Sequence, residues 1–224
     1  PFTLNVLAGN SGDPAFDRNA VTNDLIELFR RVLYRGVQEA FGPMFEVYFR
    51  NAALLLMASQ GPDATILEFE RIFQDEEFRE ELIGRCPLQY VADFWNKTAE
   101  RVSCSDLSLQ NVAPYIICKL NQITTNERLR PILGATRSSL DFTGIIAGRK
   151  ICLVNLDKAQ LGEKSSAFLG GIMLSRLCMA ALAQGRLAPK NRVPCSIVLD
   201  EFHTFATDSL PSMLAETRKF GFRV

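Results

Sequence analysis

The chain has 224 residues, and its 25 lysines and arginines balance its 25 aspartates and glutamates. This length is enough for one large domain or two small ones with a buried core. Because the net charge is zero, the composition gives no separate argument for nucleic acid or an anionic membrane as a partner. The single histidine excludes a multi-histidine metal site. The six cysteines include no CxxC pair, so we expect reduced thiols in a cytosolic protein.

Both chain ends lead us to expect a fragment of a longer protein. The chain begins at Pro1 rather than at a methionine, and residues 221–224 resemble a helix stop followed by the start of a strand. The longest nearly apolar stretch, 167–183, carries Arg176 near its middle. An arginine at the bilayer centre costs about 2.5 to 3.5 kcal/mol on insertion scales. We therefore expect a buried helix here rather than a membrane span.

Helical patterns dominate the first two thirds of the chain, after an extended segment at 1–7 and a loop at 8–15. Apolar residues recur at helical spacing between Leu25 and Leu33. Further helices are expected at 43–59, 65–73, 76–83, 91–102 and 108–122. We expect residues 16–145 to form an all-helical subdomain.

The pattern then changes to that of alternating strands and helices. Residues 151–156 are a short apolar run without helical period, which is typical of a buried strand. A helix is expected at 165–185, and a second apolar run follows at 195–200. Strand, helix and strand make a βαβ unit, whose two strands are parallel. The predicted fold is therefore α/β, with a parallel sheet in residues 1–15 and 146–224 and the helical subdomain inserted between them.

The second apolar run ends in two adjacent acids, Asp200 and Glu201. Open α/β sheets bind their ligands just beyond the carboxyl ends of their strands. In P-loop NTPases the first acid holds the Mg²⁺ that bridges the nucleotide phosphates, and a neighbouring acid takes a proton from the attacking water. The pair therefore predicts an ATPase site, with Asp200 as the Mg²⁺ ligand and Glu201 as the catalytic base. The alternative for an isolated Asp-Glu pair is a simple helix cap after a strand.

An ATPase also needs a phosphate cradle, usually GxxxxGK[ST] between a strand and a helix. The sequence contains no such motif. Gly162-Glu-Lys-Ser165 is the nearest imitation, but Glu163 stands where the motif needs a glycine, and its carboxylate would repel phosphate. We expect this loop to be a strand-to-helix connector. The Walker A motif is then expected upstream of Pro1.

Three further residues are candidates for contacts near this site. His203 completes an Asp-Glu-Phe-His tetrad that matches the DExH box of superfamily 2 helicases, although a loop histidine after a Walker B strand is the preferred interpretation. Arg218 and Lys219 lie one helix beyond the acids and can meet phosphate, DNA or a neighbouring subunit. A solvated cationic helix end, which suits the helix dipole, explains the basic pair equally well.

A series of sequence segments falls in the order seen in one group of ATPases. The segments are Phe2–Leu7, Phe41–Ala52, Phe78-Arg79, Phe94-Trp95, Ser138–Phe142, Lys150–Leu156, Leu161-Gly162, Leu199–Phe205 and Arg218–Gly221. Over almost its whole length the chain resembles the TraG/TraD-like type IV coupling proteins and conjugative DNA-transfer ATPases of the HerA/FtsK superfamily.

The resemblance implies a RecA-like P-loop NTPase core with an inserted helical subdomain, assembled as a hexameric ring that pumps DNA using ATP and Mg²⁺. It implies that Asp200 organises Mg²⁺ and Glu201 polarises water, while Arg218 and Lys219 match an Arg-Lys pair of unassigned role. Type IV secretion or relaxosome components would be partners. The parent protein would lie in the cytoplasm, tethered to the inner membrane if segments outside this chain supply an anchor. The alternatives are a secretion or pilus-assembly ATPase that acts on protein, a DExH-type helicase, and a non-catalytic helical adaptor.

Overall fold

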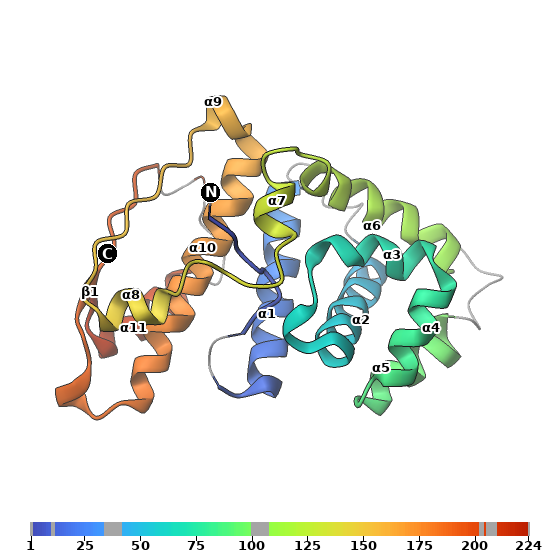
Figure 1. Ribbon diagram of the computed structural model, residues 1–224, viewed down its shortest axis with the longest axis horizontal. Coiled ribbons are helices and arrows are strands. Elements are labelled where there is room, and N and C mark those ends of the chain that lie inside the picture. Colours follow the sequence, from blue (N-terminus) through green and yellow to red (C-terminus); the bar gives the residue numbers. More distant parts are fainter. Residues whose placement is uncertain are drawn as a thin grey trace. The chain divides into compact units, whose positions relative to one another are not determined.

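A computed structural model describes residues 2–9, 12–33, 42–99, 108–201, 204 and 210–223 (Figure 1). The chain falls into two units. The first comprises Pro1–Ala8 and Arg18–Ser139, and the second comprises Gly9–Asp17 and Leu140–Val224. The division near residue 140 lies close to the end of the predicted helical subdomain, and the predicted core segment 1–15 is split, with residues 1–8 in the first unit and 9–15 in the second.

The first unit is built from helices. They are α1 (Pro14–Leu28), which crosses the division between the units, η1 (Phe29–Leu33), α2 (Pro43–Gln60), η3 (Gly61–Asp63), η4 (Ile66–Glu68), α3 (Phe69–Gln74), α4 (Glu76–Arg85), α5 (Gln89–Asp93), η5 (Phe94–Ala99), α6 (Leu109–Thr124) and α7 (Arg130–Leu133). The helices predicted at 43–59, 65–73, 76–83 and 108–122 are confirmed, with ends that differ by at most two residues.

Helix α2 contacts α3, α4 and α6 of the first unit (Figure 1). Pro43 lies in its first turn, where backbone N–H groups have no partner within the helix, so the N–H that proline lacks costs no hydrogen bond. Phe45 and Phe49 belong to its buried face, at the spacing of one helical turn. The Phe49 ring lies 4.8 Å from the Phe29 ring and 4.9 Å from the Phe69 ring, measured between centroids. The ring contacts among Phe29, Phe49 and Phe69 stabilise the core of the helical unit.

The second unit is organised around α10 (Glu163–Ala183), which contacts α8 (Phe142–Ala147), α9 (Lys158–Leu161) and α11 (Leu210–Thr217) (Figure 1). Short 3₁₀ turns follow at η6 (Gln184–Arg186), η7 (Pro189–Asn191) and η9 (Arg218–Phe220). By length and composition Glu163–Arg186 is able to cross a membrane, but 78% of its most apolar window is buried. The prediction of a buried helix at 167–183 is therefore confirmed.

In the described part of the chain the sheet consists of two short strands, β1 (Cys195–Ser196) and β2 (Phe222–Arg223). The strands are parallel, with Cys195 opposite Phe222. The Ile197 N–H continues this pairing by donating to the carbonyl of Arg223 at 2.8 Å. The first residues of the run 195–200 thus pair with a strand that follows them in the sequence.

The predicted α/β fold, a RecA-like core with a parallel sheet, is wrong for the residues that the structure describes. These residues are mostly helical, and residues 151–156 are extended but pair neither with β1 nor with any other described segment. Ile151 is 90% exposed and Leu153 is 92% exposed, although this run was expected to be buried. An apolar run becomes a strand only where neighbouring backbone satisfies its N–H and C=O groups. Composition indicates the extended conformation but not the presence of that neighbour.

Candidate functional site

The acidic pair lies at a tight turn where the extended segment that begins as β1 ends. Glu201 has a φ of 49°, a left-handed conformation that costs residues other than glycine about 1 to 2 kcal/mol. Its N–H donates to Oδ1 of Asp200 at 2.9 Å, and its carbonyl accepts the N–H of Thr204 at 2.9 Å. Both acidic residues are exposed. The turn therefore presents two neighbouring carboxylates to solvent.

Lys158 brings a positive charge to this turn from the end of the other extended segment. Asp157 caps α9 by accepting the N–H of Ala159 at 2.8 Å, which fixes Lys158 as the first residue of that helix. Nζ of Lys158 donates to Oε2 of Glu201 in an ion pair and lies 3.4 Å from Oγ1 of Thr204. The Lys158 and Glu201 side chains are 40% and 55% exposed, so water screens the pair. The contact restrains the Glu201 carboxylate without removing it from solvent.

Lys158 was not among the site residues predicted from the sequence. A signal for it exists in the sequence. Lys158 stands just beyond the apolar run 151–156, as Asp200 and Glu201 stand at the end of the run 195–200. Side chains that follow two parallel extended segments meet at one edge of the structure. This shared position was enough to place Lys158 near the acids.

The oxygen atoms of the acidic pair suit Mg²⁺ that is held together with a nucleotide. Mg²⁺ is usually bound through one or two carboxylates plus the phosphates of its substrate. Oδ1 of Asp200 accepts the Glu201 N–H, while Oδ2 makes no hydrogen bond within the described residues. Those residues contain no group of three or more His, Cys, Asp or Glu side chains that could hold a metal ion alone. A bound Mg²⁺ would therefore take most of its ligands from phosphate and water.

The loop that most resembles a phosphate cradle joins two helices. Gly162, with a φ of 82°, separates α9 from α10, and the exposed Glu163 lies in the first turn of α10. Ser165 is buried, and the hydroxyl of Ser166 donates to the carbonyl of Leu156 at 2.7 Å. The loop is thus a helix-to-helix connector rather than the strand-to-helix connector that was expected. Its physical role is to attach the start of α10 to the extended segment 151–156.

The basic pair does not join the acidic turn. Arg218 and Lys219 lie in η9, immediately before β2, and both are exposed. Neither side chain makes a hydrogen bond or ion pair with Asp200 or Glu201. His203, the third candidate, lies outside the described residues. The structure therefore does not bring the acidic pair and the basic pair together.

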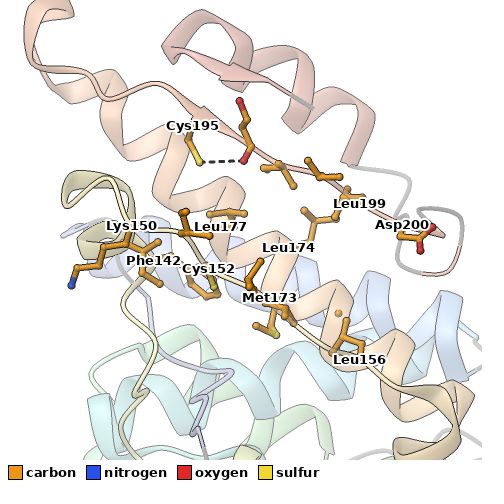
Figure 2. Close-up of a pocket in the computed structure, with 18 of the residues that line it drawn as sticks. Phe142, Lys150, Cys152, Leu156, Met173, Leu174, Leu177, Cys195, Leu199 and Asp200 are labelled. Atoms are coloured by element: carbon orange, nitrogen blue, oxygen red, sulfur yellow. Dashed lines mark hydrogen bonds between the residues drawn. The ribbon is translucent and has the colours of Figure 1, made fainter.

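A cavity of about 1020 Å³ opens between the two extended segments of the second unit (Figure 2). Its lining is mostly apolar. Residues 150–158 form one wall, residues 193–201 form the other, and Met173, Leu174 and Leu177 of α10 lie between them. Burial raises the pKa of the Cys195 thiol in one wall, so this cysteine stays protonated at neutral pH. The acidic turn stands at one end of this cavity.

Comparison with known proteins found no relative of this chain. No family model, curated protein or solved structure matches the chain. The family resemblance rests on the order of sequence segments, and the candidate site rests on the geometry of Asp200, Glu201 and Lys158.

Proposed function

We propose that this chain carries the acidic half of an ATP-hydrolysing site in a motor that moves DNA. The observation that carries the proposal is the turn in which Asp200 and Glu201 lie side by side at the end of an extended segment, with Lys158 bonded to Glu201. Strained left-handed residues concentrate at active sites, and Glu201 is such a residue. A helix cap would accept the N–H two or three residues further on, whereas Asp200 accepts the N–H of the very next residue.

Each residue of the turn has a distinct role in this proposal. Asp200 holds Mg²⁺ through Oδ2, which makes no hydrogen bond with any residue that the structure describes, and when bound this ion neutralises charge on the nucleotide phosphates. Glu201 accepts the proton of the attacking water as general base. Lys158 keeps the Glu201 carboxylate in position without burying it. The phosphate cradle comes from polypeptide outside these 224 residues, since no GxxxxGK[ST] motif occurs within them.

The DNA substrate is supported by the sequence rather than by the turn. The order of segments resembles that of conjugative DNA-transfer ATPases, which assemble as hexameric rings and work with type IV secretion or relaxosome components. Arg218 and Lys219 are exposed and stay candidates for contacts with DNA or a neighbouring subunit. A cytoplasmic motor of this kind would show ATP turnover that rises when DNA is added. A secretion or pilus-assembly ATPase that acts on protein would show no such stimulation.

The experiment compares two substitutions in the full-length polypeptide, meaning the natural polypeptide that contains this chain. Glu201→Gln keeps the size of the side chain but cannot accept a proton, so ATP turnover should fall by roughly 10² to 10⁴-fold while Mg-ATP binding survives. Asp200→Asn should weaken Mg²⁺-dependent ATP binding as well, because the metal ion loses an acidic ligand.

Glu216→Gln is the matched control, since Glu216 is an exposed glutamate on α11 that makes no hydrogen bond or ion pair with Asp200, Glu201 or Lys158. It should leave both turnover and binding unchanged. Wild-type turnover in Glu201→Gln would show that the acidic pair is structural, and the hydrolase proposal would fail. If Glu201→Gln abolishes turnover but DNA does not stimulate the wild-type protein, the hydrolase proposal stands and the DNA-motor proposal fails.

A further inference from the structure

The Lys158 side chain has a hydrogen-bond donor that the described residues leave unused. A lysine ammonium group carries three N–H donors. One donates to Oε2 of Glu201, and a second reaches Oγ1 of Thr204 at 3.4 Å. The third has no partner among the residues that the structure describes. Because the Lys158 side chain is 40% exposed, a ligand that arrives from solvent can reach this third donor.

The backbone of Lys158 is held in place while the end of its side chain is not buried. Asp157 accepts the N–H of Ala159 at 2.8 Å, and the carbonyl of Lys158 accepts the N–H of Gly162 at 2.9 Å. These bonds fix the short helix α9 from which the side chain extends. The flexible four-carbon stem of lysine lets the ammonium group turn toward a neighbouring ligand. Such a contact therefore needs no change in the fold of the second unit.

The role proposed for Glu201 brings the γ-phosphate of ATP close to this donor. A general base lies about 2.6 to 3.2 Å from the water whose proton it accepts. That water lies about 3 to 3.5 Å from the phosphorus atom that it attacks. Since the ammonium group of Lys158 is bonded to the same carboxylate, the terminal phosphate comes within reach of the Lys158 side chain.

The charges at the turn also favour a cationic contact to phosphate at this place. Asp200 and Glu201 are adjacent carboxylates, and each repels a phosphate group. Mg²⁺ held by Asp200 would offset the first repulsion. Lys158 offsets the second, because its ammonium group lies against the Glu201 carboxylate. Lysine binds phosphate as a compact point charge, which this arrangement requires.

We propose that Lys158 donates its third N–H to the γ-phosphate of ATP bound at this turn, while it keeps its bond to Glu201. ADP lacks the group that Lys158 contacts. The site therefore distinguishes a nucleoside triphosphate from a diphosphate through this one side chain, and hydrolysis removes a contact that holds the nucleotide. This assignment rests on the hydrolytic site proposed above and adds a ligand contact to the positioning role of Lys158.

Equilibrium binding of nucleotides to the full-length polypeptide tests this contact in the Glu201→Gln background. In that background ATP is scarcely hydrolysed, and Lys158 cannot act through the charge of Glu201. Adding Lys158→Met should weaken Mg-ATP binding by roughly five- to tenfold, because a charge-assisted hydrogen bond to phosphate is lost. Mg-ADP binding should change by less than about twofold, because ADP does not meet Lys158.

Lys190→Met in the same background is the matched control. Lys190 is an exposed lysine of η7 that makes no hydrogen bond or ion pair with Glu201, so its loss should leave both affinities unchanged. Lys158→Arg keeps a cationic donor and should keep most of the preference for ATP.

Two results would overturn the contact between Lys158 and phosphate. One is equal Mg-ATP affinity with and without Lys158→Met, and the other is equal weakening of ATP and ADP binding, which a general disturbance of the site would cause. In both cases, loss of turnover in Glu201→Gln alone would leave the hydrolase proposal standing. Wild-type turnover in Glu201→Gln would reject the hydrolase proposal and this contact together.

Discussion

The ammonium group of Lys158 donates to the carboxylate of Glu201, which lies 43 residues further along the chain. The two residues follow different extended segments of the second unit and meet where those segments end. Because both side chains are about half exposed, the ion pair contributes at most about 1 kcal/mol to folding stability. The ion pair matters more for position than for stability, because it limits the orientations that the Glu201 carboxylate can adopt.

Replacing Lys158 by methionine should therefore affect catalysis more than folding. Lys158→Met keeps most of the length of the side chain but cannot donate to Glu201. Because water screens this pair, its loss is worth at most about 1 kcal/mol, so ATP turnover of the full-length polypeptide should fall by up to roughly fivefold. The melting temperature should stay nearly unchanged. Turnover and thermal unfolding of the same protein sample measure the two effects.

Two control variants separate a role in positioning from a general effect of charge. Lys158→Arg restores a cationic donor and should recover most of the turnover. Lys190→Met removes an exposed lysine of η7 that does not contact Glu201, and its turnover should equal that of the wild type. Wild-type turnover in Lys158→Met would show that Glu201 needs no help from this lysine.

The 224-residue chain by itself should not hydrolyse ATP. The loop Gly162–Ser165 connects two helices and presents Glu163 rather than a phosphate-binding glycine, so this loop does not cradle the β- and γ-phosphates. Turnover of the purified chain with Mg-ATP should equal the background without protein, measured as released phosphate. Robust turnover that disappears in Lys164→Ala would mean that this loop does bind phosphate.

The helical unit could be predicted from the sequence because its signals are local. The apolar residues of α2 recur at the helical period, and Asp75 and Ser108 occupy positions where side chains cap helices. The sheet could not be predicted in the same way. Residues 151–156 have the composition of a buried strand, but their pairing depends on a neighbour that composition does not specify. The same dependence explains why the exposure of Leu153 was unexpected.

The candidate site was predictable only in part, for a related reason. Asp200 and Glu201 are adjacent in sequence, so their proximity needs no tertiary information. Lys158 reaches Glu201 through the fold of the second unit, and it was not among the predicted site residues. The basic pair Arg218 and Lys219 shows the opposite case, because nearness in sequence to the acids did not produce a contact.

The cap of α4 should make the stability of the helical unit depend on pH. Oδ1 of Asp75 accepts the N–H of Phe78 at 3.0 Å, and Oδ2 accepts from Arg71 at 3.1 Å. These bonds, first that from the Phe78 backbone and then that from Arg71, hold the pKa of Asp75 below its usual value of 3.8. A carboxylate with a lowered folded-state pKa stabilises the fold above its unfolded-state pKa, and the contribution is lost as the pH falls through the folded-state pKa.

Asp75→Ala should accordingly lower the melting temperature at pH 7, and the difference from wild type should stay constant down to about pH 5. Below pH 3.8 the difference should narrow, because the wild-type carboxylate becomes protonated and loses its charge-assisted bonds. Asp63→Ala, at an exposed aspartate of the same unit, controls for the loss of one negative charge. Thermal unfolding followed by circular dichroism at pH 7, 5 and about 3 measures the difference in melting temperature between each variant and the wild type. A gap between Asp75→Ala and wild type that stays constant, or widens, as the pH falls below 3.8 would contradict the assignment of Asp75 as a charged cap.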